Sequence, residues 1–116
     1  MRYMFLIYTN ETSDANATEA DQKEVMDAYN AFTAEVEKRK AMVAGDALQP
    51  TTTATTLNVR NGKTLTTDGP YTETKEQLGG FYILNCKDLN EAIELGGKIP
   101  GAKWGYVEIR PIMEFN

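Results

Sequence analysis

The order of secondary structure predicted along the chain favours an α+β fold. Short apolar runs typical of β-strands alternate with two segments of helical periodicity, and a turn-rich segment with strand preference lies in the middle. The order strand, helix, strand, hairpin, strand, helix, strand contains two βαβ-like halves. We therefore predict a split-βαβ, ferredoxin-like sandwich with an inserted β-hairpin, in which one antiparallel sheet carries both helices on one face. The 116 residues fit a single domain, 1–116.

The first strand and the first helix have the clearest patterns. Residues 2–8, RYMFLIY, form a continuous apolar and aromatic run, which predicts a central strand buried on both faces. The polar segment 10–18 is predicted to be a loop. Thr18 is then a suitable N-cap, and the basic triplet 38–40 suits a helix C-terminus. Between them the apolar residues recur at helical spacing: Val25, Met26, Tyr29, Phe32 and Val36.

The remaining strands and the second helix follow from similar signals. Residues 42–48 and 80–86 predict two strands, and residues 105–112 predict the last one. Asp88 followed by Glu91 resembles a capping box at the start of a helix. Its predicted apolar stripe consists of Ala92, Ile93 and Leu95.

Residues 51–67 predict the inserted hairpin, with Asn61-Gly62 at its turn. A two-residue turn would place Leu65 opposite Asn58, whereas a three-residue loop would place Leu65 opposite Leu57. We favour the second register because apolar residues on the same face should meet.

Composition excludes several classes of partner and site. The net charge is −5, from 17 acids and 12 bases, which disfavours nucleic acids and anionic membrane surfaces. No run approaches the roughly 18 apolar residues of a membrane span, and the apolar start is too short for a signal peptide, so we expect a cytoplasmic protein. The absence of histidine and the single cysteine, Cys86, argue against histidine triads and zinc or thiolate sites. We expect no metal or organic cofactor, and Cys86 as a core residue.

The predicted sheet has one face that the helices do not cover. Its strands are apolar or aromatic on both sides, so the second face must be buried against something else. A second copy of the chain is the simplest partner, which predicts a homodimer.

The last strand alternates apolar residues with a polar face formed by Tyr106, Glu108 and Arg110. If this face points into a dimer interior, Glu108 would be partly desolvated and could exchange protons near neutral pH, while Arg110 could hold an anionic ligand. The alternative is a structural ion pair of Glu108 with Arg110 or with a loop acid such as Glu73.

The segment TDGPYTETKEQLGGF, residues 67–81, concentrates charge before a strand. Asp68-Gly69-Pro70 is a turn-former in its own right, and the following charges could form a solvated surface. A proline-fixed loop can equally present functional side chains on a scaffold. The predicted catalytic residues are Asp68, Glu73 and Glu108, and the predicted substrate-binding residues are Tyr29, Lys75, Tyr82, Tyr106 and Arg110.

The longer stretch TDGPYTETKEQLGGFYIL resembles the defining segment of DGPF-domain proteins of the YCII-related family, with Tyr71 in place of phenylalanine. The similarity extends to RYMFLIY at the start and GYVEIRPIMEF at the close. This resemblance implies a dimeric α+β barrel, in which two sheets pack face to face around a cleft. It also implies two kinds of relative, a lyase thought to use a histidine and an aspartate, and domains that accompany sigma factors.

This chain has no histidine, so that catalytic pair does not carry over, and Trp104 stands where related chains often have a histidine. Two hypotheses follow. The first is a small-molecule-binding protein with a cleft at the dimer interface, acting as a cofactor-free lyase or isomerase through its carboxylates. The second is a non-catalytic ligand-binding or regulatory module, linked to sigma-factor-type transcriptional regulation. A purely structural role is the third option.

Overall fold

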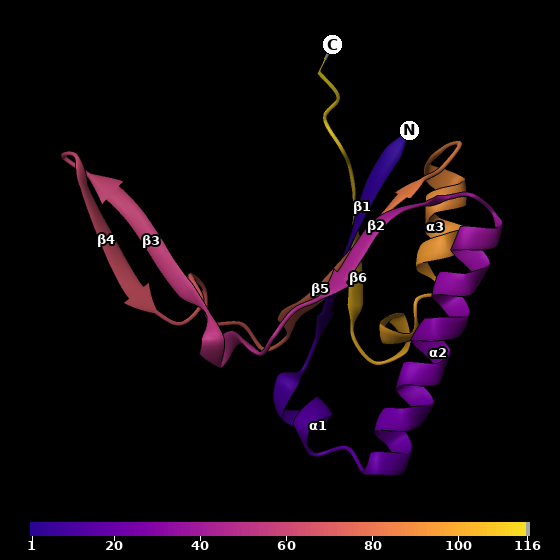
Figure 1. Cartoon of the computed structure of the whole chain (residues 1–116), viewed down its shortest axis with the longest axis horizontal. Helices are drawn as coiled ribbons and strands as arrows, with labels where there is room; N and C mark the ends of the chain where they lie inside the picture. Colours follow the sequence, from indigo (N-terminus) through magenta and orange to yellow (C-terminus); the bar gives the residue numbers. More distant parts are fainter. Residues whose placement is uncertain (116) are drawn as a thin grey trace.

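The computed structural model, which describes residues 1–115, is a mixed α+β structure with antiparallel sheets (Figure 1). The elements follow the predicted order, with one additional short helix and two 3₁₀ turns. In chain order they are β1 (Arg2–Thr9), α1 (Glu11–Ala15), α2 (Glu19–Lys38), β2 (Met42–Ala47), η1 (Thr51–Thr53), β3 (Thr55–Arg60), β4 (Lys63–Asp68), β5 (Gln77–Asn85), α3 (Leu89–Gly96), η2 (Pro100–Lys103) and β6 (Tyr106–Pro111).

Four strands form the main sheet in the order β2-β5-β1-β6, and each neighbouring pair is antiparallel. β1 lies in the interior of the sheet, as its continuous apolar run predicted. Its side chains alternate between two faces. Tyr3, Phe5 and Ile7 lie on the buried face, and Met4, Leu6 and Tyr8 lie on the half-exposed face.

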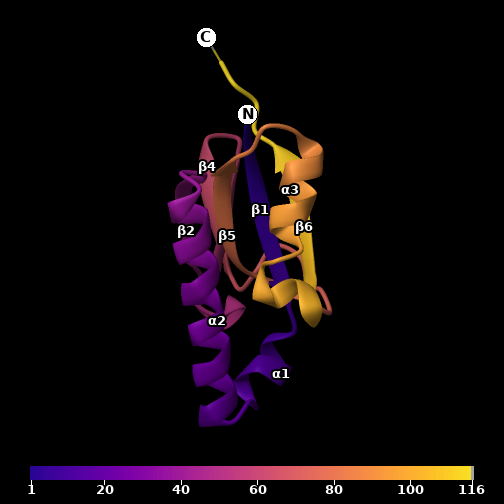
Figure 2. The same ribbon diagram turned by 90° about the vertical axis from the view of Figure 1, so that its right-hand side faces the viewer.

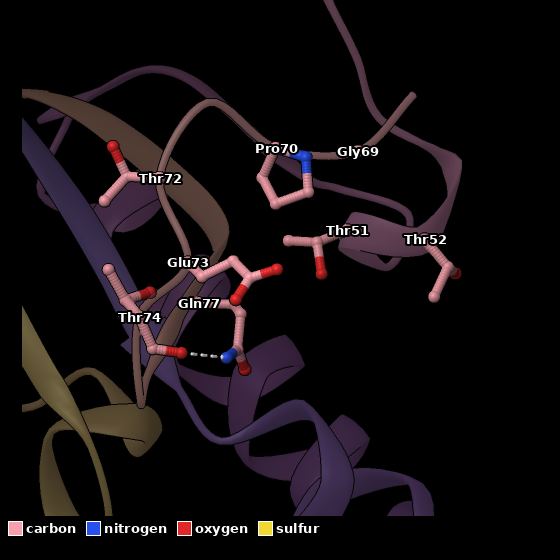
Figure 3. A pocket seen from close by; sticks show the side chains of 8 residues that line it. All are labelled: Thr51, Thr52, Gly69, Pro70, Thr72, Glu73, Thr74 and Gln77. Carbon is pink, nitrogen blue, oxygen red and sulfur yellow. Dashed lines mark hydrogen bonds between the residues drawn. The ribbon is translucent and has the colours of Figure 1, made fainter. Parts of the chain in front are cut away.

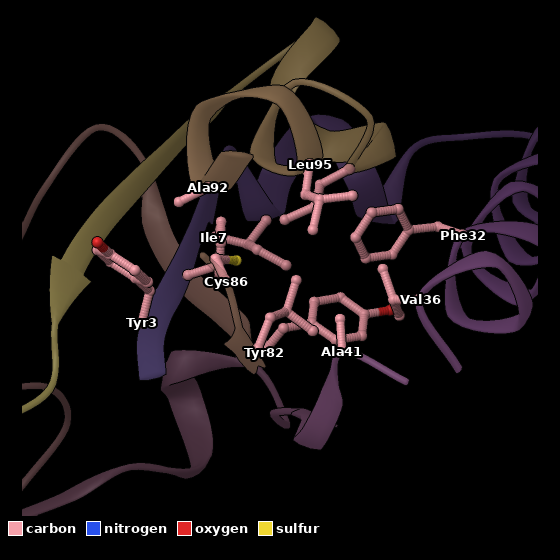
Figure 4. Close-up of a cluster of buried hydrophobic side chains, with 12 residues drawn as sticks. Tyr3, Ile7, Phe32, Val36, Ala41, Tyr82, Cys86, Ala92 and Leu95 are labelled. Carbon is pink, nitrogen blue, oxygen red and sulfur yellow. The ribbon is translucent and has the colours of Figure 1, made fainter. Parts of the chain in front are cut away.

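Helices α2 and α3 cover the buried face of this sheet (Figures 1 and 2). The core lies between the helices and the sheet (Figure 4), and its largest fully buried side chains are Phe5, Leu84, Leu95, Ile99 and Val36. Cys86 is also buried in this core, as predicted. Burial raises the pKa of its thiol, which makes Cys86 a poor nucleophile.

The predicted start of α2 is confirmed, because the Thr18 hydroxyl accepts a hydrogen bond from the Asp21 backbone N–H at 3.1 Å. Its apolar stripe is only partly buried. Phe32 and Val36 lie in the core, whereas Met26 is 61% exposed. The reason is that the first half of α2 extends past the end of the sheet (Figure 1).

The start of α3 is also confirmed, since the Asp88 carboxylate accepts from the Glu91 N–H at 2.9 Å. The Glu91 carboxylate accepts from the Lys87 N–H rather than from Asp88, so the box is one residue wider than the usual form. The buried stripe is narrower than predicted, because Ile93 is 56% exposed while Leu95 is buried.

The segment predicted as a loop at residues 10–18 contains the short helix α1, so that prediction is wrong. The Asn10 side chain caps it by accepting from the Ser13 N–H at 2.9 Å. Tertiary contacts hold this helix, since five residues are too few for a stable helix in water.

The predicted register of the hairpin is also wrong. Asn58 pairs with Leu65 and Leu57 pairs with Thr66, so the turn contains two residues. Asn61 and Gly62 both have positive φ angles, 52° and 75°, as a type I′ turn requires. Because the hairpin does not pack on the sheet, no burial favours the pairing of Leu57 with Leu65, and the turn chemistry decides.

The described residues form no closed barrel within one subunit. The face of the sheet away from the helices, called here the open face, presents half-exposed apolar side chains at its centre. They come from β1 and β5 and comprise Met4, Leu6, Tyr8, Leu78, Phe81 and Ile83. Across the part of the chain described, no helix has the length and apolarity that crossing a membrane requires.

Candidate functional site

An open cavity of about 410 Å³, lined mainly by residues with polar side chains, lies where the hairpin joins the sheet (Figure 3). Three separate stretches of the chain contribute to it, namely η1, the loop after β4 and the start of β5. We call it the loop pocket, and its lining residues are Thr51, Thr52, Gly69, Pro70, Thr72, Glu73, Thr74 and Gln77.

Glu11 of α1 fastens η1 in place beside this pocket. One carboxylate oxygen accepts from the Thr51 N–H at 2.8 Å, and the other accepts from the Thr51 hydroxyl at 2.7 Å. The Glu11 N–H in turn donates to the Gln77 side-chain oxygen at 2.9 Å. One residue therefore links the threonine-rich turn to the start of β5.

Gln77 orders the loop from the other side. Its side-chain amide donates to the Thr74 carbonyl at 2.6 Å (Figure 3), and the Asn10 amide donates to the Lys75 carbonyl at 3.2 Å. Lys75 thus supports the loop through its backbone, and its side chain is exposed. The Glu73 carboxylate extends between Thr51 and Gln77 in the close view.

Two hydrogen bonds to the backbone of Gly69 hold the turn at Asp68-Gly69-Pro70. The Gly69 N–H donates to the Ala54 carbonyl at 2.7 Å, and the Thr56 hydroxyl donates to the Gly69 carbonyl at 2.8 Å. Gly69 has a φ angle of 103°, a conformation that favours glycine. The exposed Asp68 carboxylate accepts no hydrogen bond within residues 1–115, so the Asp68 side chain does not support this turn.

Tyr106, Glu108 and Arg110 share one face of β6, as the alternation predicted, and this face belongs to the open face of the sheet. Tyr106, Glu108 and Arg110 stand opposite Tyr8, Leu6 and Met4 of β1, respectively. The Arg110 Nε and the Glu108 Oε2 are 3.8 Å apart, and both side chains are at least half exposed in the subunit. Such an exposed pair contributes little to stability.

Tyr29 and Tyr82 lie on the opposite side of the sheet, in the layer of the helices. The Gly101 N–H donates to the Tyr29 hydroxyl at 3.1 Å, and the Tyr82 hydroxyl lies 3.1 Å from that of Thr33. Burial raises the pKa of Tyr29. Within one subunit, the eight predicted site residues therefore fall in three places: the hairpin root and its loop, the open face, and the helix layer.

Sequence reasoning missed most residues of the loop pocket. The threonines at 51, 52, 72 and 74 carry no local motif that marks them as site residues, and neither do Glu11 and Gln77. The one available signal was the polar start of segment 10–18, where asparagine followed by an acid is a typical helix N-terminus.

Neither a metal site nor a second site with predicted residues is found in the part of the chain described. The described residues contain no group of three or more histidine, cysteine, aspartate or glutamate side chains that could hold a metal ion. A second, wider cavity of about 800 Å³ lies between α2 and η2, and Trp104 is part of its lining. It contains none of the eight predicted site residues.

Taken together, the chain is an α+β protein with one helix-covered antiparallel sheet, an inserted hairpin and a polar pocket at the root of that hairpin. The family of the YCII-related domain, also called DGPF, matches residues 1–116, and the chain belongs to this family. An uncharacterized protein of Rhizobium meliloti (strain 1021) is 35% identical over 119 residues, which cover 97% of this chain and 92% of that protein.

Proposed function

We propose that this protein is a homodimeric small-molecule-binding protein whose ligand occupies the loop pocket. The observation that carries the proposal is the construction of this pocket, in which Glu11 and Gln77 hold η1 and the loop around a cavity of about 410 Å³. Ligand sites are commonly concave spaces of about 300–1,000 Å³ with a few fixed polar groups. Here those groups are four threonines, one carboxylate and one amide.

The chemistry of the lining favours a neutral or cationic polar ligand. Glu73 is the one charged residue among the eight that line the pocket. Hydroxyls and the Gln77 amide can each donate or accept hydrogen bonds, which suits hydroxyl and amine groups on a ligand. This differs from the anionic ligand expected from Lys75 and Arg110, because neither lines this pocket.

The sheet supports the dimeric part of the proposal. Its order, β2-β5-β1-β6, with α2 and α3 on one face, supports the ferredoxin-like sandwich that we propose. Two such sheets packed through their open faces would bury the half-exposed Leu6 and Phe81, which pair with each other. η1 and the loop lie on that same side of the sheet (Figure 1), so the pocket would open near the subunit interface.

An NMR titration with three sugars of equal ring size, the cationic glucosamine, the neutral glucose and the anionic glucuronate, tests the ligand class. We expect glucosamine, and glucose more weakly, to shift the amide signals of Thr51, Thr72 and Gln77. Glu73→Gln should weaken glucosamine binding about tenfold because a charge-assisted hydrogen bond to the amine is lost. Glu76→Gln is the matched control, since Glu76 is outside the lining. Equal binding to both variants would contradict the proposal.

A second candidate function is cofactor-free acid–base catalysis at the open face, as in a lyase or an isomerase. The 3.8 Å approach of Arg110 to Glu108 favours it, because Arg110 could hold an anionic substrate beside a carboxylate that moves a proton. Glucuronate in the same titration would then shift signals of β6, and Arg110→Met would abolish those shifts. Shifts confined to the loop pocket would count against this candidate and favour a binding module without turnover, including a regulatory one.

A further inference from the structure

The β3–β4 hairpin leaves apolar side chains in solvent. Leu57, Val59 and Leu65 are 61%, 54% and 54% exposed, and every residue of β4 is exposed. A hairpin of two strands is at best marginally stable in water, because it has no second layer to pack against. The hairpin therefore needs a surface that the rest of its own subunit does not provide.

The observed register gives the hairpin two unlike faces. One is called here the uncharged face and consists of Thr55, Leu57, Val59, Thr64 and Thr66. The nearest charge on this side is Asp68, which pairs with Thr55 at the root of the hairpin. The other carries Arg60 and Lys63 with Leu65. Such a division is typical of a ribbon that packs one face and leaves the other in water.

The hairpin projects on the side of the sheet that has no helices (Figures 1 and 2). This is also the side of the open face, so a single partner could cover both apolar surfaces. Strands of six residues extend about 20 Å, and a four-stranded sheet is about 15 Å wide between its outer strands. The hairpin is thus long enough to cross the sheet of a partner.

Charge indicates which partner fits. Residues 55–67 contain two bases and no acid, which gives the hairpin a charge of +2. Because the net charge of the chain is −5, the rest of the chain carries −7. Arg60 and Lys63 face each other at the tip, a like-charge pair that disfavours the hairpin, and neither takes part in an ion pair within the described residues. The hairpin is therefore basic and the rest of the chain acidic, so the hairpin of one copy is attracted to the body of a second copy even though Arg60 and Lys63 themselves lie on the face that stays in water.

We propose that the hairpin is an arm that packs its uncharged face onto a second copy of this chain and so fixes the loop pocket at its own root. The inference rests on the homodimer of the proposed function. In a twofold dimer each subunit would embrace the other in the same way. The link to the pocket is short, because β4 runs directly into Gly69 and Pro70 of the lining.

Serine substitutions on the two faces of the hairpin test the arm. The double variant Leu57→Ser/Val59→Ser should raise the dimer dissociation constant at least tenfold. Each apolar contact that the substitutions remove occurs twice in a symmetric dimer, so its loss counts twice. Leu65→Ser is the matched control, because Leu65 is as exposed as Val59 but lies on the charged face. The dimer dissociation constant of this variant should equal that of the unchanged chain. Sedimentation velocity across a concentration series measures all three. Equal constants for the double variant and the unchanged chain would overturn the arm.

Hydrogen exchange on the unchanged chain gives a second test that needs no substitution. The amides of β3, β4 and the pocket loop should exchange more slowly at protein concentrations above the dimer dissociation constant than at concentrations below it. The exchange rates of the amides of the buried β5 should not change. The same exchange at both concentrations would overturn the arm but leave the homodimer standing. A chain that stays monomeric throughout would overturn the homodimer as well, whereas loss of sugar binding alone would concern the pocket.

Discussion

Glu11 joins segments that are far apart in the sequence. Its carboxylate holds Thr51 by two hydrogen bonds, and its backbone N–H binds Gln77. Both contacts serve the loop pocket, although Glu11 itself does not line it. Its position in the first turn of α1 also suits a negative charge, because the positive end of a helix dipole lies there.

Replacing Glu11 should loosen this side of the pocket. Glu11→Ala is expected to lower the free energy of unfolding by about 1–3 kcal/mol, since two charge-assisted hydrogen bonds are lost. Urea unfolding measures this, and hydrogen exchange at Thr51 should become faster. Glu19→Ala is the control, because Glu19 is an acid in the first turn of α2 and accepts no hydrogen bond from η1. An effect of equal size in both variants would show that Glu11 acts through its charge alone.

Tyr29 should make stability depend on alkaline pH. Burial raises its pKa in the folded state, so above about pH 10 the unfolded chain loses the phenolic proton first. The free energy of unfolding should therefore fall as the pH rises past 10, and less steeply in Tyr29→Phe. Urea unfolding between pH 8 and about 11 measures the difference. Identical slopes would mean that Tyr29 is more hydrated than its contact with Gly101 implies.

Among the elements, α3 depends on its N-cap. Asp88→Ala should lower the free energy of unfolding by about 1 kcal/mol, because the Glu91 N–H loses the carboxylate acceptor that lies 2.9 Å away. Asp88→Asn should restore most of the loss, since asparagine caps equally well. Thermal or urea unfolding of the three proteins decides this. If asparagine fails to rescue, the carboxylate charge rather than the hydrogen bond stabilises the helix.

The hairpin shows how an element behaves when it does not pack on the sheet. In the main sheet, burial of one face sets the register, as in the alternation along β1. In β3–β4 the turn residues Asn61 and Gly62 set it instead, and Leu57 and Leu65 end on opposite faces. The assumption that apolar residues meet is valid only where a core rewards their meeting.

For the whole molecule, the open face decides whether subunits associate. Leu6→Asp, at the centre of that face, should make the protein monomeric at concentrations where the unchanged chain is dimeric, because a charge would be buried without a partner. Its melting temperature should also become independent of protein concentration. Leu89→Asp, on the exposed side of α3, should leave association unchanged. Sedimentation velocity that finds Leu6→Asp still dimeric would place the interface elsewhere.

The amino-acid sequence by itself determined the strands of the main sheet, the two long helices and the central place of β1, because local periodicity and capping signals act within a few residues. It also placed Tyr106, Glu108 and Arg110 on one face, since alternation in a strand is a local property.

The tertiary structure alone decided the loop pocket and the separation of Tyr29 and Tyr82 from the polar face of β6. The pocket depends on Glu11 meeting Thr51 and Gln77, which lie 40 and 66 residues further along the chain. No local pattern encodes such a meeting, because it follows from how the sheet and helices pack. The face on which each tyrosine lies was likewise set by the strand order and the helix layer.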